Sequence, residues 1–92
     1  MRIRWYVYGI GYDVNDCVTD YSQCFGDFNT YDEAFKAFEE LRNRSEESFF
    51  EKIPKMYQLV IQIEECEEDD NESSCIDVYD EFWVKNPNFE NE

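Results

Sequence analysis

The fold of this chain is constrained most by two segments of alternating apolar and polar residues with a run of negative charge between them. Residues Gln58–Cys66 and Cys75–Val84 alternate apolar and polar side chains, which is typical of strands that bury one face. In the second segment we expect Ile76 and Val78 to point inward. Seven of the nine residues from Glu64 to Glu72 are acidic. The pattern predicts a β-hairpin whose strand end and connecting loop carry Glu64, Glu65, Glu67, Glu68, Asp69, Asp70 and Glu72.

A second hairpin is predicted at the start of the chain. Arg2–Tyr8 alternates, with its apolar residues on one face and its tyrosines on the other. Gly9 and Gly11 indicate a bulge or a twist near the end of this strand. A weaker strand follows over Cys17–Phe25, where β-formers outnumber polar residues, and Gly26–Asn29 is expected to end it.

The segment between the hairpins predicts one main helix. Thr30 and Glu33 have the spacing of a capping box, in which each side chain satisfies a backbone N–H at the helix start. The helix is expected to end at Arg42 or Arg44. Its apolar stripe repeats at helical spacing and contains Ala34, Phe38 and Leu41.

The predicted order is β-β-α-β-β, an α+β fold with a four-stranded antiparallel sheet and the main helix packed on one face. A short helical turn is expected over Ser45–Phe50, and the pairing between the two hairpins stays open. Residues 1–85 form a single domain, and residues 86–92 are expected to be a frayed tail. The sheet face away from the helix is predicted to carry Tyr6, Tyr8, Gln58, Gln62 and Tyr79, a composition common at protein interfaces.

The charge of the chain limits what it can bind. There are 23 acidic and 8 basic residues, for a formal net charge of −15. From Glu64 to Glu92 twelve acidic residues face one base, Lys85. Affinity for phosphates requires a basic face, so direct nucleic-acid binding is disfavoured. The charge either serves solubility or attracts a basic partner protein.

The sequence also predicts where the protein works. Its eight Phe, seven Tyr and two Trp residues argue against an intrinsically disordered chain. No segment has the pattern of a signal peptide or the length of a membrane span, so we expect no membrane partner and a cytoplasmic protein. In a phage-encoded protein this would be the host-cell cytoplasm.

The residues that usually carry catalysis or hold a metal are missing or differently spaced. There is no histidine, and 92 residues leave little room for a substrate cleft. Six residues separate Cys17 from Cys24 and eight separate Cys66 from Cys75, unlike the short ligand pairs of structural zinc sites. Asp69–Glu72 offers oxygen ligands suited to calcium, without the glycine of the calcium-binding loop. We therefore predict no enzyme, cofactor or metal, and reduced thiols, of which Cys66 and Cys75 could face each other.

The acidic run has a charge density close to that of nucleic acid. A strand places one residue every ~3.3 Å, and one strand of duplex DNA carries a phosphate every ~3.4 Å. A row of carboxylates could therefore enter a basic cleft built for DNA. The candidate partner-binding residues are the seven acidic residues of Glu64–Glu72 together with Asp77. Tyr6, Tyr8 and Tyr79 would act as anchors that lose their hydration on binding.

The chain resembles the small acidic anti-CRISPR and anti-restriction proteins of phages and other mobile elements. The resemblance rests on size, net charge and the acidic residues of Glu64–Glu72 with Asp77, Asp80 and Glu81. It implies an inhibitor that occupies the DNA-binding surface of an RNA-guided nuclease or restriction enzyme. The chain departs from a pure mimic in one basic group, which contains Lys36, Arg42, Arg44, Lys52 and Lys55.

A second hypothesis needs no mimicry. A small interaction or regulatory module could bind a partner through the tyrosine-rich sheet face, with the charge serving solubility alone. An oligomer built through an open sheet edge is compatible with either hypothesis. Salt separates the two, because binding by charge weakens as ionic strength rises and binding by aromatic residues does not.

Overall fold

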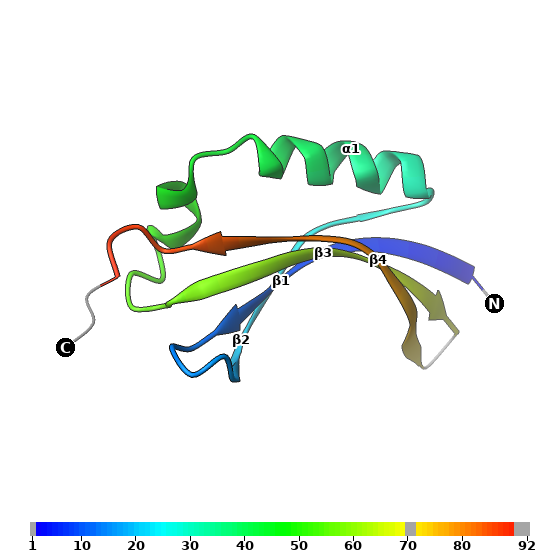
Figure 1. Cartoon of the computed structure of the whole chain (residues 1–92). Helices are drawn as coiled ribbons and strands as arrows, with labels where there is room; N and C mark the ends of the chain where they lie inside the picture. Colours follow the sequence, from blue (N-terminus) through cyan, green and yellow to red (C-terminus); the bar gives the residue numbers. More distant parts are fainter. Residues whose placement is uncertain (1, 70–71, 90–92) are drawn as a thin grey trace.

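The computed structural model describes residues 2–69 and 72–89. Its four strands form one antiparallel sheet in the order β2-β1-β3-β4, and a helix lies across one face (Figure 1). The predicted α+β fold with four antiparallel strands and one helix is confirmed. The element order differs from β-β-α-β-β by a 3-10 helix. The elements are β1 (Arg2–Tyr12), β2 (Val18–Phe28), α1 (Tyr31–Arg42), η1 (Glu46–Phe50), β3 (Gln58–Glu68) and β4 (Ser73–Lys85).

The pairing between the hairpins runs through the centre of the sheet. β1 pairs with β3 along its whole length, from Arg2 opposite Glu68 to Tyr12 opposite Gln58. The two more polar strands, β2 and β4, lie at the edges. The sequence left this pairing open because nothing local in either hairpin specifies it.

Helix α1 forms where the sequence predicts it. The Thr30 hydroxyl accepts a hydrogen bond from the Glu33 backbone N–H at 3.3 Å, which satisfies a free donor of the first turn. The predicted stripe is buried against the sheet. The core consists of Val7, Ala34, Phe38, Leu41, Phe49, Phe50, Leu59, Ile61, Ile63 and Val84. Each large apolar side chain buried in this way stabilises the fold by about 1.5–3 kcal/mol.

Two glycines in β1 leave room for side chains that pack closely against this strand. A Cβ on Gly9 would lie 2.7 Å from the Phe25 ring, and one on Gly11 would lie 2.7 Å from the Met56 sulfur. β1 pairs with β3 without a register shift through both positions. Against β2, however, β1 has a register shift between Ile10 and Tyr12, so an irregularity at Gly11 is present as predicted, and close packing accounts for glycine at both positions.

Both edge strands are less regular than predicted. β2 continues through Gly26 to Phe28, because its register shift against β1 accommodates the glycine within the strand. β4 has 13 residues against 11 in β3, and two register shifts absorb the difference. Ile76 and Val78 are 51% and 40% exposed. The prediction that they point inward is wrong, because the bulges change which residues face the core.

The residues after β4 pack against the segment that precedes β3. The Asn86 side chain is buried and donates hydrogen bonds to the carbonyl oxygens of Pro54 and Met56 at 3.0 and 2.9 Å. The Phe89 ring lies 5.0 Å from the Tyr57 ring. The expected fraying thus does not apply to residues 86–89, while residues 90–92 lie outside the described residues.

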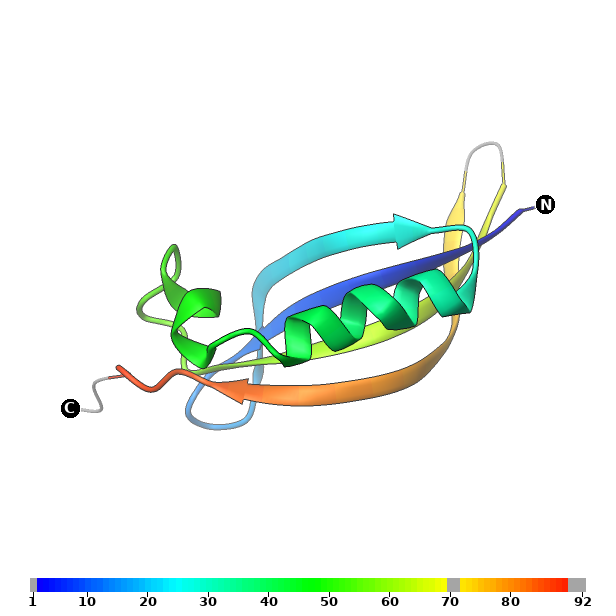
Figure 2. The same cartoon turned by 90° about the horizontal axis from the view of Figure 1, so that it is seen from above.

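The domain is elongated, with principal extents of 48 × 26 × 20 Å. The start of the chain, the start of α1 and the far end of the β3–β4 hairpin lie at one end (Figure 2). η1 and the beginning of β3 lie at the other end (Figure 1). We call the first the hairpin end, after the β3–β4 hairpin, and the second the η1 end.

Candidate functional site

Most of the acidic run belongs to a strand. β3 extends through Glu68, so Glu64 and Glu65 lie in a strand as predicted, whereas the prediction that Glu67 and Glu68 lie in the loop is wrong. Pairing with β1 holds these residues extended, since Arg2 and Glu68 are register partners. The backbones of Asp69 and Glu72 exchange two hydrogen bonds, of 2.7 and 3.3 Å, where the hairpin closes. Asp70 lies outside the described residues.

Strand geometry divides the carboxylates between the two sides of the sheet. Glu64 and Glu68 lie on the open face, since their β1 partners are Tyr6 and Arg2. Glu65 and Glu67 alternate onto the helix side. Residues on one side are separated by about 6.6–6.8 Å, twice the strand rise. The predicted single row is therefore replaced by two rows, each with half the charge density.

Hydrogen bonds fix several of these carboxylates. Glu68 accepts from the Tyr6 hydroxyl and has Arg2 as an ion-pair partner at 3.9 Å. Glu65 accepts from the Tyr79 hydroxyl at 2.7 Å. Glu64 accepts from the Gln62 amide at 3.2 Å. The hydrogen bond to Glu68, and then burial, raises the pKa of Tyr6 to about 12.

Other elements add charge at the hairpin end. Asp77 of β4 lies opposite Glu65 in the register. Asp32 and Glu33 lie in the first turn of α1. Asp80 accepts a hydrogen bond from Tyr31, which raises the pKa of that tyrosine to about 12. Carboxylates of three elements therefore gather around this end.

Basic residues lie mainly toward the η1 end. Arg44 stacks over the Phe49 ring at 5.7 Å, and Lys85 lies 5.5 Å from the Tyr57 ring. Lys52 and Lys55 line hollows in the segment after η1. Arg44, Lys52 and Lys55 of the basic group thus lie away from the carboxylates of the hairpin end, whereas Arg42 pairs with Glu39 of its own helix at 3.4 Å.

The predicted tyrosines do not share one face. Tyr6 and Tyr8 lie on the open face with ring centroids 6.1 Å apart. Tyr79 lies on the helix side, with its ring 5.2 Å from Trp5 and 5.8 Å from Tyr31. The placement of Tyr79 on the open face is wrong because the bulge in β4 turns its side chain over.

The open face also carries a hollow that the sequence did not predict. Its volume is about 360 Å³, and its walls are Tyr6, Tyr8, Ile10, Ser22, Glu64, Cys66 and Cys75. Cys66 and Cys75 are register partners, as predicted. Burial raises the pKa of Cys66. Partial desolvation of the Sγ atom and a hydrogen bond with Glu64 raise the pKa of Cys75 to about 12, although the residue as a whole is exposed.

Beside this hollow lies an aromatic patch that sequence reasoning missed. Trp83 is half exposed and its ring lies 4.9 Å from Tyr12. Val60 is 2% exposed, although it lies on the open face between Ile10 and Trp83. The sequence signal for this patch was the spacing of Trp83 two residues from both Glu81 and Lys85, which places it on the same face as these charged residues.

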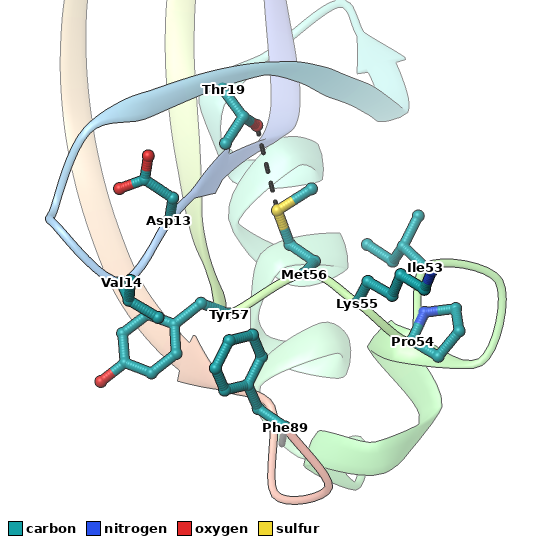
Figure 3. Close-up of a pocket in the computed structure, with 9 residues that line it drawn as sticks. All are labelled: Asp13, Val14, Thr19, Ile53, Pro54, Lys55, Met56, Tyr57 and Phe89. Carbon is teal, nitrogen blue, oxygen red and sulfur yellow. Dashed lines mark hydrogen bonds between the residues drawn. The ribbon is translucent and has the colours of Figure 1, made fainter. Parts of the chain in front are cut away.

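A separate apolar pocket lies at the η1 end (Figure 3). Its volume is about 610 Å³, and Val14, Met56, Tyr57 and Phe89 contribute to its lining. The Thr19 hydroxyl lies 3.0 Å from the Gly11 carbonyl oxygen and 3.9 Å from the Met56 sulfur. The pocket joins segments that are distant in sequence, so no local pattern predicts it.

Comparisons with known proteins add no constraint on the function. Within the part of the chain that the structure describes, no helix is both long and apolar enough to span a membrane. Comparison with family models, with curated proteins and with solved structures finds no match for this chain.

Proposed function

We propose that this protein is an inhibitor that binds the basic, nucleic-acid-binding surface of another protein through its hairpin end. The partner class we favour is a phage-defence nuclease, either an RNA-guided nuclease or a restriction enzyme. The observation that carries the proposal is the gathering of carboxylates from β3, β4 and the start of α1 at one end of an elongated domain. A charge spread for solubility alone would not need this arrangement.

Preorganisation supports binding by these carboxylates. Glu64, Glu65 and Glu68 each accept a hydrogen bond from a neighbouring side chain. Groups already held in place lose less conformational entropy on binding than free side chains do. Two rows on opposite sides of β3 also present negative charge over a ridge, as a duplex does with its two phosphate strands.

Aromatic side chains beside the carboxylates supply the contacts that charge lacks. Tyr6 and Tyr8 flank Glu64 on the open face, whereas Trp5 and Tyr79 accompany Glu65 on the helix side. Charge complementarity raises the association rate and the specificity, and buried aromatic anchors slow dissociation. We therefore expect the interface to centre on β3 and to use both sides of the hairpin.

Competition with DNA tests the proposal. A panel of purified RNA-guided nucleases and restriction enzymes is incubated with labelled target DNA, with and without this protein, at low and high salt. We expect one enzyme to lose its DNA complex at low salt and to regain it at high salt. If DNA binding and cleavage are unchanged across the panel, the inhibitor is rejected. If cleavage stops while DNA stays bound, the mimicry is rejected.

Matched charge reversals locate the surface. The test variant carries Glu67→Lys, Glu72→Lys and Asp77→Lys at the hairpin end. The control variant carries the same number of reversals at the η1 end, at Glu46, Glu47 and Glu51. Both variants change the net charge equally, so only a localised binding site distinguishes them. We expect the test variant to lose competition and the control variant to keep it.

A second candidate function rests on the aromatic patch of Trp83, Tyr12 and Val60. A half-exposed tryptophan next to tyrosine is the composition of an interface hot spot. An interaction module using this patch would bind its partner almost independently of salt. Trp83→Ala would abolish that binding, while the reversals at the hairpin end would leave it intact.

A further inference from the structure

Three side chains on the open face converge on one point. The carboxylate of Glu64 and the thiols of Cys66 and Cys75 place their ligand atoms within 4.8 Å of one another. The three residues also line the hollow of about 360 Å³ on that face. A carboxylate oxygen and two sulfurs form a ligand set that zinc accepts in proteins.

The strand register creates this convergence. Glu64 and Cys66 are two residues apart on β3 and therefore point to the same side. Cys75 lies directly opposite Cys66 on β4, and residues so paired have Cβ atoms about 4.5–5.5 Å apart. The separation of the cysteines along the chain resembles no zinc motif, because cross-strand pairing rather than a short loop brings them together.

A buried arginine lies on the strand beside the cluster. Arg4 is the register partner of Cys66 on β1 and is 9% exposed. Its guanidinium pairs with Asp27 at 2.9 Å, while its Nε has no hydrogen-bond partner among the described residues. Two thiolates and one carboxylate carry three negative charges. A divalent cation would offset two of these charges, while the Arg4 guanidinium is already paired with Asp27.

We propose that Glu64, Cys66 and Cys75 bind a thiophilic divalent cation of the zinc class. The protein supplies three ligands, and the fourth tetrahedral position opens into the hollow beside Tyr6 and Tyr8. Binding releases the two thiol protons to solvent as the two metal–sulfur bonds form. The Gln62 amide that donates to Glu64 holds the carboxylate in place, as outer partners of metal ligands do. The site shares Glu64 with the proposed partner-binding surface, but metal binding is measured without a partner and does not rest on the proposed function.

Cobalt titration tests the site through its spectrum. Full-length protein is reduced with a phosphine reductant and titrated with Co²⁺ in the absence of other metals. We expect a thiolate-to-cobalt charge-transfer band and the intense visible bands of tetrahedral cobalt, which saturate at one equivalent and disappear when Zn²⁺ is added. Absence of the charge-transfer band, or cobalt bound through carboxylates alone, overturns the site.

Variants assign the ligands. Cys75 is exposed, so Cys75→Ser tests its ligand role without disturbing the core, and it should abolish the charge-transfer band. Glu64→Gln should weaken cobalt affinity while the protein stays folded. The control is the double variant Cys17→Ser, Cys24→Ser, which removes two exposed thiols and should bind cobalt as the wild type does. An unchanged band in Cys75→Ser, or a lost band in the control, contradicts the proposal.

Discussion

Glu65 of β3 and Asp77 of β4 lie directly opposite each other in the antiparallel register. Like charges at such a position destabilise a strand pair. Glu65 accepts a hydrogen bond from the Tyr79 hydroxyl, and Asp77 accepts one from the Val78 backbone N–H at 2.8 Å. Local hydrogen bonds thus hold both carboxylates in a repulsive arrangement, which is expected where binding rather than stability determines the residue.

The variant Asp77→Asn tests separately what Asp77 does to stability and what it does to partner binding. Asparagine keeps the side-chain oxygen that accepts the Val78 N–H and removes the charge facing Glu65. We expect the free energy of unfolding to increase by about 0.2–1 kcal/mol, measured by urea denaturation at low salt. The same variant should bind the basic partner more weakly. The control Asp20→Asn changes an exposed carboxylate on edge strand β2. An equal increase in its free energy of unfolding would contradict repulsion between Glu65 and Asp77 as the cause.

The variant Phe38→Ala probes the contact between α1 and the sheet. Phe38 is 1% exposed and its ring lies 5.1 Å from Phe82. Truncating a buried phenylalanine costs about 3–5 kcal/mol, because a cavity remains. We expect a domain of this size to lose most of its stability, seen as a lower urea midpoint. The control is Phe35→Ala on the same helix, where the side chain is 37% exposed and the loss should be much smaller.

The variant Gly9→Ala tests the close packing under β1. The added methyl group would lie 2.7 Å from the Phe25 ring and 3.1 Å from the Ile61 side chain. Over-packing of this kind costs about 1–3 kcal/mol. The second substitution Phe25→Leu should recover part of the loss in Gly9→Ala by removing the clashing ring. A double variant no more stable than Gly9→Ala would reject the clash as the cause.

Alkaline pH should destabilise the protein through two tyrosines. The pKa of Tyr6 is raised from 10.0 to about 12, mainly by its hydrogen bond to Glu68. The pKa of Tyr31 is raised from 10.0 to about 12, mainly by its hydrogen bond to Asp80. The folded state therefore favours the protonated phenol. Its stabilising contribution is complete below about pH 10 and is lost as the pH rises to about 12.

Urea denaturation across this pH range measures the effect. Tyr6→Phe removes the hydrogen bond to Glu68 and should cost about 1 kcal/mol below pH 10. The variant should also show a shallower loss of stability toward pH 12 than the wild type. Identical slopes for the two proteins would mean that Tyr6 does not control the alkaline transition.

Sequence reasoning succeeds where the determinants are local. The Thr30 cap and the stripe of Ala34, Phe38 and Leu41 lie within one helix, so spacing alone defines them. Half of the predicted capping box differs, since the Glu33 carboxylate accepts from the Thr30 hydroxyl at 3.1 Å. The pairing of Cys66 with Cys75 also followed from the sequence, because both residues belong to one hairpin.

The predictions fail where two strands of unequal length must match. The bulges in β4 depend on β3, so alternation within β4 misplaced Val78 and Tyr79. Glu64 was placed correctly on the polar side of its strand, but its approach to the two thiols was missed because it depends on the register with β4. The burial of Arg4 was not predicted, because Asp27 and Asn29, which bind its guanidinium, are more than twenty residues away in sequence.

The separation of charge along the elongated domain has a consequence for encounter with a partner. Carboxylates outnumber bases most strongly at the hairpin end, whereas the η1 end combines Arg44 and Lys85 with Glu46, Glu47 and Glu51. The molecule is therefore an electric dipole along its longest axis. A positively charged surface exerts a torque on such a dipole before contact, and the protein rotates until its hairpin leads. Orientation then precedes docking, so a larger share of collisions is productive.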